Sequence, residues 1–182
     1  MRSNRHVALL RGINVGGNNV IKMADLRACF EAMKLTDVQT YIQSGNVVFS
    51  SRAATKAKLE KRIEAALSAS FGYAGRVVLV SAEELERVVA QAPAGFGKAP
   101  DRYRYDVVFV KQPKAPADVM QQLSTKPGVD EAGAGDHAVY FRRLISKAAQ
   151  SHLTRLVQQP IYQHVTIRNW NTTTKLLALA TA

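Results

Sequence analysis

Cysteines, carboxylates and long apolar runs are scarce in this sequence, and each shortage excludes a class of protein. Cys29 is the only cysteine in 182 residues, so a disulfide within the chain is excluded and a reducing, cytoplasmic setting is expected. No apolar run approaches the length of a membrane span. The first apolar run, from Val7 to Leu10, is too short for the core of a signal peptide. We therefore expect no membrane partner.

Acidic residues are few, with 14 Asp and Glu against 25 Lys and Arg, so the formal net charge is +11. No acidic residue follows Asp136. A positive field of this kind attracts phosphorylated metabolites, nucleic acid or acidic surfaces. The same charge is also typical of a soluble basic protein without a specific anionic partner, and both interpretations stay open. The cations form no block of five, so a basic tail is excluded.

The patterns of common catalytic, metal and cofactor sites are also missing. The four histidines have neither the i, i+4 spacing nor the cysteine partners of a zinc site, so no metal is expected. The glycine-rich segment near the N-terminus matches neither the Walker loop nor the dinucleotide fingerprint, and no cofactor is expected. Ser44 does not stand in a nucleophile elbow. The catalytic residues, if the chain has any, are unknown.

Three segments rich in Asn, Gly, Ser and Thr, at residues 11–19, 41–46 and 167–175, each stand where an apolar run ends. Amides, glycines and lone cations at strand ends predict a polar pocket on an apolar scaffold. Arg11 and Arg168 would neutralise a small anionic ligand, which is phosphorylated, nucleotide-like or a carboxylate, and Trp170 would stack on it. The expected ligand-binding residues are Arg11, Asn14, Gly16, Gly17, Asn18, Gln43, Ser44, Asn46, Arg168, Asn169, Trp170, Asn171 and Lys175.

Apolar periodicity predicts an α+β protein in which the order strand, helix, strand, strand, helix, strand occurs twice, as two ferredoxin-like units. The first subdomain is expected at residues 1–92 and the second at 105–182, with a C-terminal helix, and a linker rich in Pro and Gly at 93–104. In such a unit the first and second strands end at the same edge of the sheet. The first two polar segments should therefore converge, and the third would complete the pocket from the second subdomain.

Two local predictions concern the second subdomain. Ala149, Leu153, Leu156 and Val157 recur at helical spacing, which predicts a helix before the last strand. Asn171 or Thr172 is expected to cap the C-terminal helix.

Two other functions stay open. A transferase or hydrolase acting on a phosphorylated substrate would use Lys175 or Arg11 to stabilise developing negative charge. Nucleic-acid binding ranks below the pocket, because RNA-recognition sheets stack bases on aromatic residues of their first and third strands. Here the first strand has no aromatic residue and the third has only Phe49. The identity of the ligand and the oligomeric state are left open by the sequence.

The three polar segments, in this order, resemble the bacterial family called domain of unknown function 1697. Its motifs Leu-Arg-Gly-Ile-Asn-Val-Gly-Gly, Tyr-Ile-Gln-Ser-Gly-Asn-Val-Val-Phe and Arg-Asn-Trp-Asn-Thr-x-Thr-Lys match residues 10–17, 41–49 and 168–175. The pair Ser146-Lys147 also resembles the family, whereas the segment at 142–145 departs from the small or flexible residues that usually precede that pair. The resemblance implies two α+β subdomains and no established activity.

Overall fold

The structure is a computed structural model that describes residues 4–17, 19–52 and 55–182. Its framework is a pair of four-stranded antiparallel sheets. The chain divides into two compact units, the first running to Leu85 and including Leu176–Ala182, and the second comprising Glu86–Lys175. The predicted α+β class is confirmed. None of the helices in the described residues has the length and apolar character that a membrane span requires.

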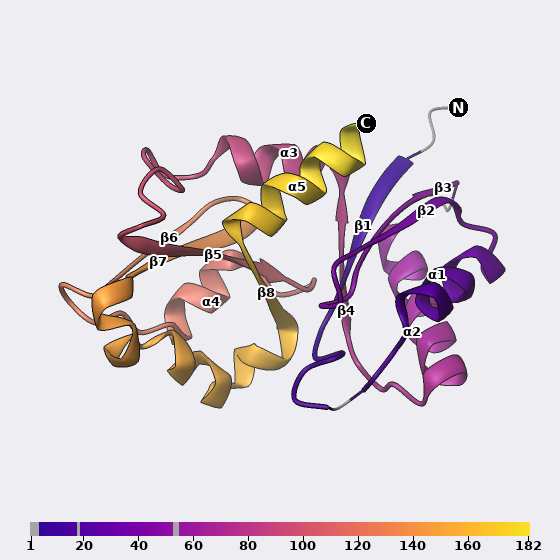
Figure 1. Cartoon of the computed structure of the whole chain (residues 1–182), viewed down its shortest axis with the longest axis horizontal. Helices are drawn as coiled ribbons and strands as arrows, with labels where there is room; N and C mark the ends of the chain where they lie inside the picture. Colours follow the sequence, from indigo (N-terminus) through magenta and orange to yellow (C-terminus); the bar gives the residue numbers. More distant parts are fainter. Residues whose placement is uncertain (1–3, 18, 53–54) are drawn as a thin grey trace. The chain divides into compact units, whose positions relative to one another are not determined.

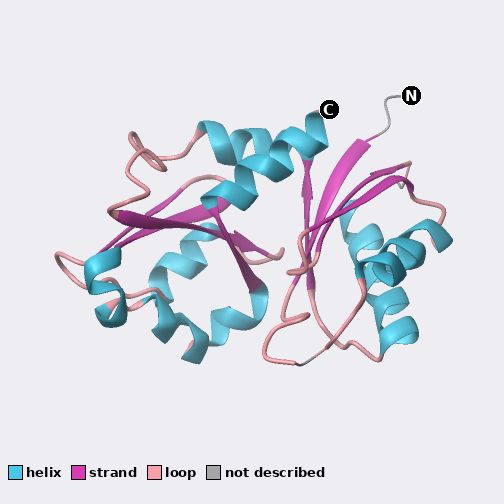
Figure 2. Cartoon of the chain, in the orientation of Figure 1, coloured by secondary structure: helices cyan, strands magenta, loops and turns pink. Residues whose placement is uncertain are grey.

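The first unit has the predicted order of elements (Figures 1 and 2). Its sheet has the order β2-β3-β1-β4 with antiparallel neighbours. This is the strand order on which the convergence of the first two polar segments was predicted. The elements are β1 Asn4–Leu10, α1 Met23–Ala32, β2 Thr36–Tyr41, β3 Asn46–Ser51, α2 Lys56–Phe71 and β4 Val77–Ser81.

The central strand β1 is buried on both of its faces, from Val7 to Leu10. Alternate side chains, Ala8 and Leu10, belong to the core that α1 and α2 build on one face of the sheet (Figure 1). Phe30 of α1 and Ile63 of α2 are wholly buried in that core because they lie on the apolar stripes of their helices. Such a strand leaves no open sheet surface on which bases could stack.

The second unit repeats the strand order, with the sheet β6-β7-β5-β8 and β5 in a central position. Val108 and Phe141 of this sheet pack with Val119 of α4 in a separate core. The helix α3 Ala82–Ala90 spans the division between the units. The remaining elements are β5 Tyr103–Val110, α4 Pro116–Gln122, β6 Asp130–Ala134, β7 Ala138–Leu144, β8 Val165–Asn169 and α5 Trp170–Thr181.

The prediction of a single helix from about Ala149 to Val157 is wrong. Three short 3₁₀ helices stand there, η1 Ile145–Gln150, η2 Leu153–Gln158 and η3 Pro160–His164. Extended backbone at Ser151 separates the first two, and Pro160 has no N–H with which to continue a helix. Leu153 and Leu156 are buried, whereas Ala149 and Val157 are exposed, so the apolar spacing identified only two of its four core positions and did not identify the helix type.

The structure also differs from the predicted linker at residues 93–104. This segment belongs to the second unit, where Phe96 is only 7% exposed and packs edge-on against the rings of Tyr105 and Tyr140. The end of α5 is grouped with the first unit, where Arg5 Nη2 donates to Leu179 O over 2.8 Å. Glycine and proline thus mark turns in a packed loop here rather than a flexible boundary.

His6 is a buried titratable group on the central strand of the first unit. Its side chain is 8% exposed, and its Nδ1 is buried without a hydrogen-bond partner in the described residues. Burial lowers the pKa of His6, the charge of Lys56 lowers it further, and Glu84 acts in the opposite direction. Folding therefore shifts the pKa of His6 in the direction that favours the neutral imidazole.

The substitution His6→Phe should reduce the loss of unfolding free energy that occurs as the pH falls below neutrality. Below about pH 6.5 the unfolded chain binds a proton on His6 that the folded chain rejects, so stability falls as pH falls. Urea unfolding between about pH 7.5 and pH 5 should show a smaller loss in the variant than in the wild type. His137→Gln, in the turn between β6 and β7, is the control, and equal slopes for wild type and His6→Phe would refute this assignment.

Candidate functional site

The first two polar segments meet at one edge of the first sheet, which confirms the predicted convergence. The loop that follows β1 and the turn that follows β2 are joined by two hydrogen bonds. Leu10 N donates to Gly45 O over 2.8 Å, and Asn14 Nδ2 donates to Gln43 O over 2.9 Å. The strand order causes this meeting, because β1 and β2 run in the same direction and end at the same edge.

The amide side chains of this loop cluster hydrogen-bond to the protein itself. Asn14 Nδ2 also donates to Ile21 O over 3.0 Å, while its Oδ1 accepts from Ile21 N over 2.8 Å. Asn46 is fully buried, and its Nδ2 donates to Tyr41 O over 3.0 Å and to Ser44 Oγ over 3.1 Å. Both donors of each amide are therefore satisfied inside the loops, and these two side chains shape the backbone.

The other expected ligand-binding residues of the first unit are more open. The backbone of Arg11 is fixed by Tyr73, whose hydroxyl accepts from Arg11 N over 3.2 Å and donates to Arg11 O. Gly16, Gly17 and Gln43 are exposed, Arg11 and Ser44 are half-buried, and Asn18 lies outside the described residues. A role of these residues in binding stays a prediction.

Gly45 fixes the packing between the loop and the turn, and alanine there should destabilise the protein. Its φ is +80°, and a Cβ would stand 2.6 Å from Ile13 Cδ1 and 2.8 Å from Leu10 Cβ. Gly17→Ala is a matched control, since φ is +78° and no atom lies within 4 Å of the added Cβ. We expect a loss of about 1 kcal/mol for Gly17→Ala from the backbone alone. Gly45→Ala should lose about 1–3 kcal/mol more through overpacking, measured by urea denaturation, and equal losses would contradict the steric argument.

The third polar segment belongs to the second unit up to Lys175. Arg168 is only 8% exposed, and its Nη1 donates to Thr166 Oγ1 and to Ile167 O, both over 2.9 Å. Lys175 is exposed on α5. Neither residue is among those that line the pocket described next, whereas Asn169, Trp170 and Asn171 are. A single pocket formed by all three segments stays a prediction.

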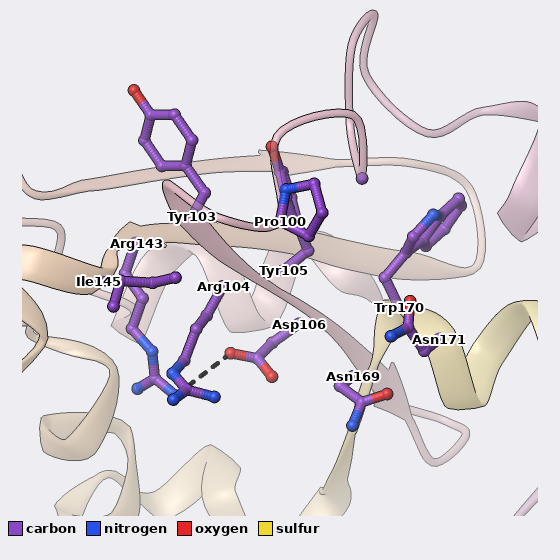
Figure 3. Close-up of a pocket in the computed structure, with 11 residues that line it drawn as sticks. Pro100, Tyr103, Arg104, Tyr105, Asp106, Arg143, Ile145, Asn169, Trp170 and Asn171 are labelled. Atoms are coloured by element: carbon purple, nitrogen blue, oxygen red, sulfur yellow. Dashed lines mark ion pairs between the residues drawn. The ribbon is translucent and has the colours of Figure 1, made fainter.

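A pocket of about 380 Å³ opens in the second unit, where β5 begins and β7 and β8 end (Figure 3). It combines charged groups, amides and aromatic rings within one sheet and the loop before it. Its lining residues are Gly97, Pro100, Tyr103, Arg104, Tyr105, Asp106, Arg143, Ile145, Asn169, Trp170 and Asn171.

Two arginines form the cationic wall of this pocket. Arg104 of β5 and Arg143 of β7 are directly opposed in the sheet register, and their side chains extend side by side (Figure 3). Like charges in directly opposed positions destabilise a sheet. Within the described part of the chain the Arg104 guanidinium makes no hydrogen bond, and Arg143 Nε is buried without a partner. The wall therefore keeps unused hydrogen-bond donors.

Asp106 is the one carboxylate among the lining residues. It follows Arg104 by two positions on β5, so both side chains point to the same face of the sheet. Its Oδ2 lies 3.5 Å from Arg143 Nη2, which is longer than a charge-assisted hydrogen bond. Burial raises the pKa of Asp106, while the charges of Arg143 and Arg104 lower it. The pocket thus combines two arginine side chains with one carboxylate whose charged form is disfavoured by burial.

Asn169 lies opposite Asp106 in the register of β5 and β8, and it caps α5. Its Oδ1 accepts from Thr172 N over 2.8 Å, which is the N-cap geometry. The prediction that Asn171 or Thr172 caps this helix is therefore wrong, because the helix begins at Trp170. Capping uses the amide oxygen of Asn169, so its NH₂ group remains as a donor beside Asp106 (Figure 3).

Trp170, the only tryptophan in the chain, has its ring held on one side by the loop before β5. The ring meets Phe96 edge to face, with centroids 5.2 Å apart. A Cβ on Gly97 would stand 2.3 Å from Trp170 Nε1, so the backbone of Gly97 packs directly on the indole. Trp170 is half-buried and lines the pocket, and its fluorescence therefore reports on this site alone.

Substituting Gly97 should move the indole. In Gly97→Ala the new Cβ would collide with Trp170 Nε1 and Cδ1, and φ is +82°. Gly95→Ala is the control, because its φ is +77° and no atom lies within 4 Å. We expect a shift of the Trp170 emission maximum and a stability loss larger than that of the control by about 1–3 kcal/mol. Identical spectra for both variants would rule out this packing.

Eight of the lining residues were not expected from the sequence: Gly97, Pro100, Tyr103, Arg104, Tyr105, Asp106, Arg143 and Ile145. A signal was present, since charged and aromatic residues alternate from 102 to 106 at the entry of an apolar strand. Strand alternation places the charges on one face and the rings on the other. The adjacent arginines at 142 and 143 also lie where the sequence departs from the family pattern.

The chemistry of the lining suits binding by charge and hydrogen bonds. None of the eleven lining residues is a Ser, Thr, Cys, His, Lys or Glu, so the pocket offers no thiol, aliphatic hydroxyl or amine nucleophile and no carboxylate pair. Across the described ranges, no group of three or more His, Cys, Asp or Glu side chains is arranged to hold a metal ion.

Comparison with known proteins places the chain in a family. A family model described as "Protein of unknown function (DUF1697)" matches residues 3–140, so the chain belongs to that family. The solved structure of the conserved bacterial protein SP0830 from Streptococcus pneumoniae is 27% identical over 98% of this chain and 99% of its own, with a TM-score of 0.86. An unknown protein from Galdieria sulphuraria is 13% identical over 92% of this chain and 96% of its own, with a TM-score of 0.28, and supports no argument. No curated protein sequence matches the chain.

Proposed function

We propose that the chain binds a small anion, bearing phosphate or carboxylate oxygens, in the pocket of the second unit. The observation that carries the proposal is the direct opposition of Arg104 and Arg143 on β5 and β7. Two guanidinium groups in directly opposed positions of a sheet repel each other. An oxyanion between them would replace this repulsion by attraction and would accept hydrogen bonds from both planar groups.

The rest of the lining supports an organic anion of modest size. The amides of Asn169 and Asn171 are neutral donors that would fix the orientation of a bound group. Trp170 provides a ring surface at the opposite end from the two arginines (Figure 3). The volume of about 380 Å³ is at the lower end of the range of small-molecule sites. Inorganic phosphate is the simplest probe of the charged end.

Titration of the full-length chain with inorganic phosphate tests this proposal. Binding can be followed by Trp170 fluorescence and by calorimetry at constant ionic strength. We expect saturable binding by the wild type, and at least a 10-fold weaker affinity for Arg104→Gln and for Arg143→Gln. Each variant removes hydrogen bonds to a charged ligand, which contribute about 1.5–3 kcal/mol each.

Arg155→Gln is the matched control, because Arg155 is an exposed cation of the second unit that does not line the pocket. It removes the same charge and should leave the affinity within about 2-fold of the wild type, since Arg155 does not line the pocket and its remaining long-range attraction is screened by salt. An equal loss in all three variants would mean that net charge alone attracts the anion. Absence of saturable binding for phosphate, phosphate esters and organic carboxylates would refute the proposed function.

A further inference from the structure

We infer that Asp106 makes this pocket selective for anions that carry an O–H group beside their charge. The inference rests on the proposed anion-binding function and names the class of anion. An ion such as sulfate, which has no proton to donate at neutral pH, would be discriminated against.

The Asp106 carboxylate lacks a hydrogen-bond donor within the described residues. Its side chain is 13% exposed, and its Oδ2 is buried with no hydrogen-bond partner. Neither of its oxygens accepts a hydrogen bond from any described residue. An ionised carboxylate offers about four acceptor positions, and a buried acceptor left without a donor is rare in folded proteins. Oδ2 itself is closed to solvent, so a donor from outside the chain would reach the carboxylate at Oδ1, which is not among the buried atoms.

The ion pair with Arg143 does not supply that donor. The distance of 3.5 Å between Arg143 Nη2 and Asp106 Oδ2 exceeds the usual length of a charge-assisted hydrogen bond. Arg143 Nε is also buried without a partner. One ligand hydroxyl could donate its hydrogen to Asp106 Oδ1 and accept, with its oxygen, from a guanidinium N–H of one of the two arginines that line the pocket. The pocket therefore presents an acceptor and a donor suited to the two sides of an O–H group.

The same carboxylate opposes an anion that has no proton. Such an anion would accept hydrogen bonds from the arginines but would leave Asp106 buried beside a second negative charge. If neutralising two arginines were the only requirement of the site, removing Asp106 would strengthen the binding of every anion. Sites that hydrogen-bond a ligand hydroxyl reject analogues without it strongly, because the buried group is left unpaired.

The O–H group can come from two sources with the same chemistry. It can be the proton that inorganic phosphate keeps at neutral pH, or a hydroxyl on the organic part of a polyol or sugar phosphate. Two pairs of probes separate these sources: inorganic phosphate against sulfate, and glycerol 3-phosphate against n-propyl phosphate. In each pair the first probe has the relevant O–H and the second lacks it at nearly the same size.

Calorimetric titration of the wild-type chain with the four probes needs no substitution. We expect the O–H probe of at least one pair to bind about 10-fold or more tightly than its partner, the effect of one hydrogen bond to a charged group. A preference for phosphate alone assigns the proton of the oxyanion, and a preference for glycerol 3-phosphate alone assigns the polyol hydroxyl. Affinities within about 2-fold in both pairs would overturn the inference while leaving the anion site intact.

Asp106→Asn tests the residue directly. The amide has a similar shape and can donate to an anion, so the ratio within the selective pair should fall to about 2-fold, mainly because the proton-free probe binds more tightly. Asp101→Asn removes the same charge from an exposed position that does not line the pocket, and should keep the wild-type ratio. An unchanged ratio in Asp106→Asn, with a folded protein by thermal unfolding, would overturn the role of Asp106. Failure of all four probes to bind the wild type would instead refute the proposed function.

Discussion

Each unit depends on its first strand, an interior strand of the sheet that is paired along both of its edges. In the first unit β1 pairs with β3 and β4, and in the second β5 pairs with β7 and β8. A strand in this position satisfies its backbone on both sides and must be apolar wherever helices or loops cover it. Polar residues are therefore confined to its ends. The loop cluster of the first unit and the pocket of the second both lie at such ends.

The two strand ends use their polar groups in different ways. After β1, the amides of Asn14 and Asn46 satisfy backbone groups of their own loops, and the result is a defined chain path. At the start of β5, Arg104, Asp106 and Arg143 are crowded together without completing one another's hydrogen bonds. Natural sequences violate local rules mainly where function requires it. This contrast favours the second unit as the place where a ligand is bound.

The fold was largely predictable because its signals are local and periodic. Apolar runs and helical spacing located the strands, α1 and α2, and the strand order then brought the segments around Asn14 and Gln43 together. The site was predictable only in part. The sequence pointed to Asn169, Trp170 and Asn171 because amides beside a lone tryptophan are unusual. It did not point to Arg104 and Arg143, because only strand pairing brings these two residues together across 39 positions of the sequence, from 104 to 143. Composition carries no information on such a pairing.

The formal charge of +11 and the pocket act at different levels. A positive field over the whole chain raises the concentration of every anion near it, and salt weakens that effect for all anions alike. It cannot explain why a carboxylate is placed beside two arginines, since Asp106 reduces the attraction for any anion. A group that weakens attraction but offers a hydrogen-bond acceptor contributes to discrimination rather than to affinity. Selectivity in this chain would therefore come from the geometry of three side chains, while its basic composition supplies only a general attraction.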